Sequence, residues 1–128
     1  MKNLLFGLLI LITVSCAKKT ETGPSFTESE GTVTGISVTT SVNIGQDAAV
    51  TVDYNGAQSC DQAGHIERAQ VGNTITVHAY YKHPSSGDPC LDSPSQLQLT
   101  FTFTPSQTGQ YIFKSPANQN IADTLTVL

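Results

Sequence analysis

The stretch QLQLTFTFT, residues 96–104, decides the fold of this chain. Apolar residues occupy every second position in it, and glutamine or threonine occupies the positions between them. Successive side chains of a β-strand point to opposite faces, so this alternation predicts a strand with one face in a core and the other in water. Pro105, which cannot donate a hydrogen bond to a sheet, ends the run.

The same period-two pattern recurs along the chain. It is clear in residues 74–81 and 48–54, and weaker runs cover residues 32–40, 65–71, 110–114 and 123–128. Glycine, proline, asparagine and serine separate these runs, and no part of the chain after residue 16 holds a helical period. We therefore predict an all-β fold of about seven antiparallel strands, arranged as two sheets packed face to face.

The N-terminus has the features of an export signal. Lys2 precedes an apolar run over residues 4–14, and about 11 residues are too few for a membrane span, which needs roughly 20. The residues Thr13-Val14-Ser15-Cys16 resemble the lipobox of bacterial lipoproteins, although that family prefers an aliphatic residue where Thr13 stands. The resemblance implies a signal peptide over residues 1–15 and lipidation of Cys16 with diacylglycerol and acyl chains such as palmitate. The alternative is an ordinary secretory signal with an incidental cysteine.

The lipobox resemblance also implies an address. Ala17 follows the cysteine, and in Gram-negative lipoproteins a residue other than Asp at that place favours the outer membrane. The polar residues after it, with Gly23-Pro24 as a breaker, predict a flexible tether over residues 16–30 and a single domain over residues 31–128. The expected location is the cell envelope, with the membrane as a partner through the lipid anchor.

Charge excludes one class of partner. The chain has six basic and ten acidic residues, and the basic ones form no cluster. Nucleic-acid binding requires a basic face, so we expect no nucleic-acid partner.

Cys60 and Cys90 remain once Cys16 is assigned to lipid. In an exported chain they are expected to form a disulfide, which closes a loop of about 30 residues. The alternative is a redox-active or metal-binding thiol pair. The absence of a Cys-x-x-Cys motif, and of another ligand nearby in sequence, disfavours that alternative.

Residues 101–113, FTFTPSQTGQYIF, carry a second resemblance. An apolar strand, a proline-containing turn and then Gly109-Gln110-Tyr111 resemble the corner before the penultimate strand of immunoglobulin-like and fibronectin-like sandwiches. The resemblance implies an immunoglobulin-like β-sandwich in which the tyrosine bonds back to nearby backbone. Gln107 and Phe113 depart from the antibody pattern, which has Asp and the second cysteine there. The whole arrangement also resembles small uncharacterised envelope lipoproteins, which implies no chemistry.

Residues with catalytic or metal-binding chemistry are few. The only plausible ligand set is His65, Glu67, His78, His83 and Asp88, which is scattered over strands and a loop. His65 and Glu67 share a strand face and could join His78 in a shallow metal site, but a solvated face is the simpler interpretation. We therefore expect no metal and no cofactor. The chain has no Gly-x-Ser-x-Gly motif or other nucleophile context, so we expect no enzyme activity.

Residues 83–94, HPSSGDPCLDSP, form the candidate recognition loop. The alternative is a plain connection restrained by the disulfide. The predicted function is a non-catalytic binding or scaffolding module, foremost for another envelope protein. Alternatives are a carbohydrate or small-ligand module and an inhibitor of an extracellular hydrolase. The residues assigned to binding are Tyr80, Tyr81, His83, Asp88 and Asp92.

Overall fold

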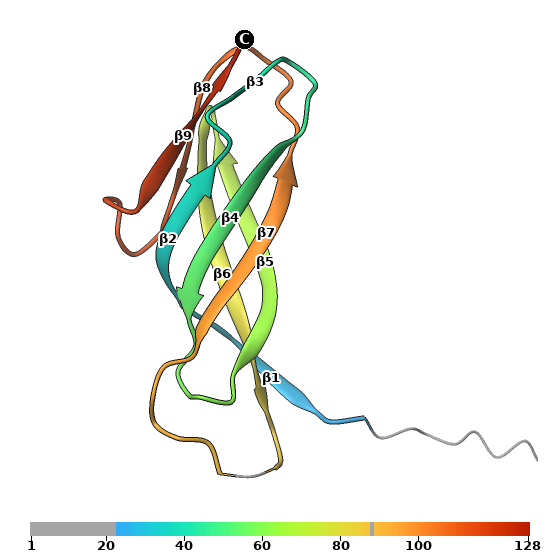
Figure 1. Cartoon of the computed structure of the whole chain (residues 1–128), viewed down its shortest axis with the longest axis vertical. Helices are drawn as coiled ribbons and strands as arrows, with labels where there is room; N and C mark the ends of the chain where they lie inside the picture. Colours follow the sequence, from blue (N-terminus) through green and yellow to red (C-terminus); the bar gives the residue numbers. More distant parts are fainter. Residues whose placement is uncertain (1–22, 88) are drawn as a thin grey trace, which may run out of the picture.

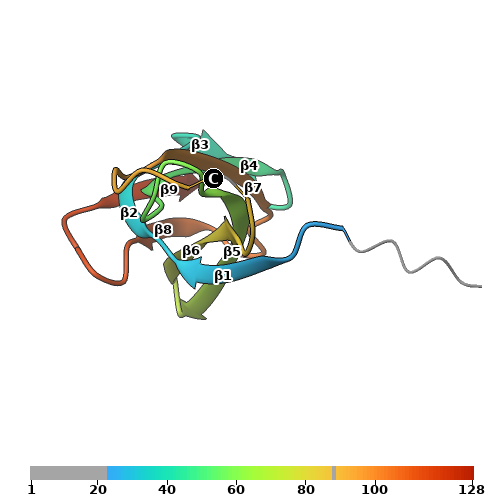
Figure 2. The same ribbon diagram turned by 90° about the horizontal axis from the view of Figure 1, so that it is seen from below.

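The computed structural model describes residues 23–87 and 89–128, and these residues form nine β-strands in two sheets (Figures 1 and 2). Cys16 and Asp88 lie outside the described residues. No helix in the described part of the chain is long and apolar enough to cross a membrane. The strands are β1 (Phe26–Glu30), β2 (Thr32–Val38), β3 (Ser41–Val42), β4 (Ala48–Asn55), β5 (Gln62–Val71), β6 (Thr74–Pro84), β7 (Gln96–Phe103), β8 (Gly109–Lys114) and β9 (Ala122–Val127).

The smaller sheet contains β2, β4 and β7, with β4 in the middle and both pairings antiparallel. Its register follows the alternation in the sequence, because Val50 pairs with Phe101 and Val52 pairs with Leu99 on the inner face. On the outer face the partners are polar, as where the hydroxyls of Thr51 and Thr100 lie 3.0 Å apart.

The larger sheet is built around β6. β5 pairs with one edge of β6. β1 and β8 share the opposite edge, with β1 antiparallel to residues 80–84 and β8 parallel to residues 74–76. β9 and then β3 continue the sheet beyond β8.

The core lies between the two sheets. Tyr54 and Phe113 are its largest fully buried side chains, and Phe103 contacts Phe113 edge to face with ring centroids 5.2 Å apart. The chain therefore forms a two-layer β-sandwich, as the alternation predicts. The other buried apolar residues of this core are Val33, Ala48, Val50, Val52, Ile75, Val77, Ala79, Tyr111, Leu125 and Val127.

The structure corrects three details of the prediction. It has nine strands among the described residues, where the sequence indicates about seven, and two pairings, β3–β9 and β6–β8, are parallel. Residues 26–30, assigned to the flexible tether, form β1 and belong to the sheet. β1 is exposed along its whole length and β3 has two residues, so neither strand shows an alternating apolar row long enough to be recognised.

A β-bulge in β5 is hydrogen-bonded to Tyr54 of the opposite sheet. Ala63 pairs with Tyr81 and Ile66 with Ala79, so two residues, Gly64 and His65, lie opposite Tyr80 alone. A Cβ atom on Gly64 would lie 2.6 Å from the Tyr80 carbonyl oxygen, so the close approach requires glycine. The hydroxyl of Tyr54, from the opposite sheet, donates to that carbonyl at 3.0 Å and accepts from the Gly64 N–H at 3.3 Å. Burial raises the pKa of this phenol above its usual 10.0, so the hydroxyl stays protonated and able to donate.

Tyr54→Phe is expected to lower the free energy of unfolding by about 1 to 3 kcal/mol, because it leaves the bulge carbonyl and N–H without their partner. Urea denaturation monitored by circular dichroism measures the change. Tyr80→Phe is the control, since its hydroxyl lies on the outer face and donates to the exposed Glu67. Equal stability of the two variants would show that the bulge does not depend on Tyr54.

Candidate functional site

The outer face of β1, β5 and β6 carries a cluster of charged and aromatic side chains. Alternation turns Ile75, Val77 and Ala79 of β6 into the core, so His78, Tyr80 and Lys82, which alternate with them, face outward. The neighbouring strands contribute the residues that pair with them or lie beside them on that face. We call this set the acidic face, and it consists of Glu28, Glu30, His65, Glu67, His78, Tyr80 and Lys82.

Carboxylate contacts connect β1 to the other two strands. Glu28 lies 3.2 Å from Nδ1 of His65 and 3.7 Å from Nζ of Lys82. Glu30 lies 2.6 Å from Nδ1 of His78. All five side chains are between 31% and 46% exposed, so these contacts fix the positions of the groups while leaving them open to a partner.

The bulge sets the aromatic part of the acidic face. It places His65 beside Tyr80, and the two rings stack in parallel with centroids 4.6 Å apart and planes 2° apart. The Tyr80 hydroxyl donates to Glu67 at 3.3 Å, and Nε2 of His65 lies 3.4 Å from the other oxygen of that carboxylate. Partial desolvation, followed by the negative charges of Glu67 and Glu30, raises the pKa of Tyr80 above its usual 10.0. The acidic face therefore has a negative potential, which attracts cations.

His65, Glu67 and His78, which were considered for a shallow metal site as the alternative to a solvated face, are not among the candidate metal ligands that the described residues bring together. His65 contacts Glu28 and Glu67, whereas His78 contacts Glu30. Within the described ranges, 23–87 and 89–128, a single group of three candidate ligands has its atoms within 4.8 Å of one another, and it consists of Cys60, His83 and Cys90.

That group lies at the end of the sandwich where β4 leads into β5 and β6 leads into β7, the lower end in Figure 1. Cys60 and Cys90 form the predicted disulfide, with Cα atoms 5.5 Å apart. Nδ1 of His83 lies 2.6 Å from Oδ1 of Asp61, whose carboxylate is fully buried. The second Asp61 oxygen accepts the backbone N–H of Gln58 at 2.8 Å. A buried, hydrogen-bonded aspartate thus orients the imidazole next to the disulfide.

A groove of about 300 Å³ is lined in part by His83. Tyr81 and His83 line it from β6, and Thr27 and Ser29 line it from β1. The lining is mainly polar, and its size suits a small polar ligand.

The described residues among those assigned to binding lie in different places. Tyr80 belongs to the acidic face, while Tyr81 and His83 line the groove. Asp92 accepts a hydrogen bond from Gln58 Nε2 at 3.2 Å, so its carboxylate joins two loops. Asp88 lies outside the described residues.

The prediction also missed Asp61, Glu28 and Glu30. The two glutamates were included in the tether, because FTESE has no alternating apolar row that would mark it as a strand. Asp61 had no signal either, because its partner His83 lies 22 residues away in sequence.

Comparison with models of protein families found no match to this chain, and neither did comparison with curated proteins or with solved structures.

Proposed function

We propose that this chain is a lipid-anchored protein of the cell envelope whose sandwich is a non-catalytic protein-interaction module. The proposal of a lipid anchor is based on the lipobox-like sequence ending at Cys16. The proposal of an outer-membrane location is based on Ala17, which follows that cysteine. The observation that carries the interaction is the acidic face, where three glutamates and a His–Tyr stack lie open on paired strands.

The proposed partner is an extended segment of another envelope protein that carries lysine or arginine. Among the described residues β5 pairs with β6 alone, so its second edge offers ten residues of backbone for strand addition. A strand added there brings its outward side chains to about 5 Å from Glu67 and His65, close enough for charge pairing. The outer face of the smaller sheet is nearly uncharged by contrast, with Asp53 held by Gln98 Nε2 at 2.7 Å.

The sandwich is also proposed to be a variant of the immunoglobulin-like fold. The Tyr111 hydroxyl donates to the backbone oxygen of Gln107 at 3.3 Å, in keeping with the corner that the Gly-x-Tyr sequence implies. Phe113 is fully buried at the position of the missing cysteine. The parallel β6–β8 pairing marks the variant, since a sandwich of this class is otherwise largely antiparallel.

Glu67→Lys is expected to reduce crosslinked partner at least about tenfold, because like charges now face each other across the added strand. The measurement is in-cell crosslinking of the lipidated chain, followed by capture and mass spectrometry. Asp53→Lys is the matched control on the opposite sheet, and Cys16→Ala is the mislocalised control. Capture of the same partner is also expected to fall with rising salt concentration.

Equal capture by the Glu67→Lys and Asp53→Lys variants would contradict docking on the acidic face. The groove lined by Tyr81 and His83 would then be the better candidate, and its occupant a saccharide or another small polar ligand. Such a ligand, added to the isolated domain, would raise its unfolding temperature in the absence of any partner protein.

A further inference from the structure

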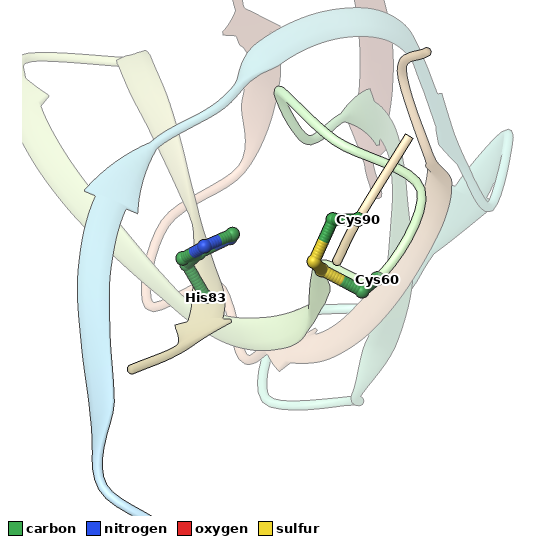
Figure 3. Close-up of side chains that lie close together, drawn as sticks. All are labelled: Cys60, His83 and Cys90. Atoms are coloured by element: carbon green, nitrogen blue, oxygen red, sulfur yellow. A yellow bond between two sulfur atoms is a disulfide. The ribbon is translucent and has the colours of Figure 1, made fainter. Parts of the chain in front are cut away.

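The disulfide and His83 form the basis of a second site, independent of the proposed docking face. Cys60 lies in the turn before β5, Cys90 in the loop before β7, and His83 near the end of β6. Figure 3 shows the three side chains meeting from these separate segments, with the imidazole directed toward the two sulfur atoms. Their candidate ligand atoms all lie within 4.8 Å of one another.

Asp61 prepares His83 to act as a ligand. We assign the ring hydrogen of His83 to Nδ1, because the Asp61 oxygen 2.6 Å away is suited to accept it. The other ring nitrogen, Nε2, then keeps its lone pair for a metal. A carboxylate that orients a histidine in this way is the usual neighbour of a metal-bound imidazole. The full burial of the Asp61 carboxylate distinguishes it from the exposed glutamates beside His65 and His78.

The two cysteine-bearing loops are held together by more than the disulfide. The Ser59 N–H donates to the Leu91 carbonyl oxygen at 3.1 Å, and the Leu91 N–H donates to the Ser59 hydroxyl oxygen at 3.1 Å. Gln58 and Asp92 add a third contact. We expect these hydrogen bonds to keep the loops adjacent when the covalent bond opens.

We propose that the reduced form of this protein binds one Zn²⁺ ion through Cys60, Cys90 and His83, with Asp61 as the positioning residue. A dithiol reductant, such as a thiol–disulfide oxidoreductase of the envelope, transfers two electrons and two protons to the disulfide. The bond between the two sulfurs breaks, each sulfur gains a proton, and the reductant's own sulfurs become a disulfide. Zn²⁺ then displaces both thiol protons into solvent.

The charges and the geometry of the resulting centre suit Zn²⁺. Two thiolates offset the double positive charge of the ion, and His83 contributes a neutral nitrogen. With Zn–S distances of about 2.3 Å in a tetrahedral site, the two sulfurs stand roughly 3.8 Å apart once the disulfide bond is broken. Water completes the four ligands. Oxidation closes the site, so metal binding reports the redox state of the compartment.

The test is calorimetric titration of the purified domain with Zn²⁺, before and after reduction by a phosphine, with Co²⁺ absorption as a check on tetrahedral thiolate ligation. The reduced wild type is expected to bind one equivalent, and the oxidised form none at this site. His83→Gln is expected to weaken binding on the order of a hundredfold, and Asp61→Asn by roughly 10- to 100-fold. His78→Gln removes a histidine held at the same 2.6 Å by Glu30, and it should leave the affinity unchanged.

A second measurement does not depend on the reduced form staying folded. The fraction of reduced protein is followed in a glutathione redox buffer with and without Zn²⁺, for the wild type and for His83→Gln. The proposed site predicts that Zn²⁺ raises the reduced fraction of the wild type far more than that of the variant. No stoichiometric binding by the folded reduced protein, or an equal response of the two chains, would overturn the proposal.

Discussion

Phe113→Ala is expected to lower the free energy of unfolding by about 3 to 5 kcal/mol, which is a large part of the stability of a domain of this size. Phe113 is fully buried in β8, between the edge-to-face ring of Phe103 and the more distant ring of Phe101. Truncation removes apolar contacts with both rings and leaves a cavity that paired strands cannot collapse to fill. Urea denaturation of the purified domain measures the loss.

Ile112→Ala is the matched control, because it shortens the adjacent residue of the same strand on the opposite face. Ile112 is 41% exposed, so its truncation should cost no more than about 0.5 kcal/mol. If the two variants lost the same stability, the inner face of β8 would not be packed as described.

The double variant Cys60→Ser, Cys90→Ser is expected to lose about 3 to 4 kcal/mol, since the disulfide closes a loop of 30 residues and restricts the unfolded chain. The sheets themselves should persist, because both cysteines lie in loops outside the core. The measurement is the shift in the urea midpoint, with far-ultraviolet circular dichroism of the native state. A fully unfolded double variant in buffer would show that the disulfide is required for the fold and does not only stabilise it.

The strands that could be predicted are those with an alternating pattern, and they include the weaker runs that form β2, β5, β8 and β9. β4, β6 and β7 alternate apolar and polar side chains over eight or more residues, and the predicted bounds differ from the observed ones by at most three residues. Such a pattern is local, because the pleat of a single strand decides which face each residue occupies.

What could not be predicted depends on residues distant in sequence. The parallel pairing of β6 with β8 is not encoded in either strand alone, since both present the same alternation in a parallel or an antiparallel ladder. β1 buries none of its five residues, so its membership of the sheet rests on backbone pairing with β6.

The same distinction between local pattern and residues distant in sequence applies to the acidic face and to the group around the disulfide. His65, Glu67 and His78 were predicted to share the outer face, because two of them lie on one strand and the third faces away from the core. The group of His83, Asp61 and the disulfide was missed. The fold brings these residues together from three segments, and sequence spacing alone argued against a further ligand near the cysteines.

The exposed strand β1 has a mechanical consequence for a protein held at its N-terminal end. Tension on that end reaches Phe26 before any residue of the core, because β1 is the first strand and none of its side chains is buried. In the lipid-anchored form proposed above, β1 would therefore take up tension from the anchor before the two packed sheets, because backbone pairing with β6 holds it to the domain.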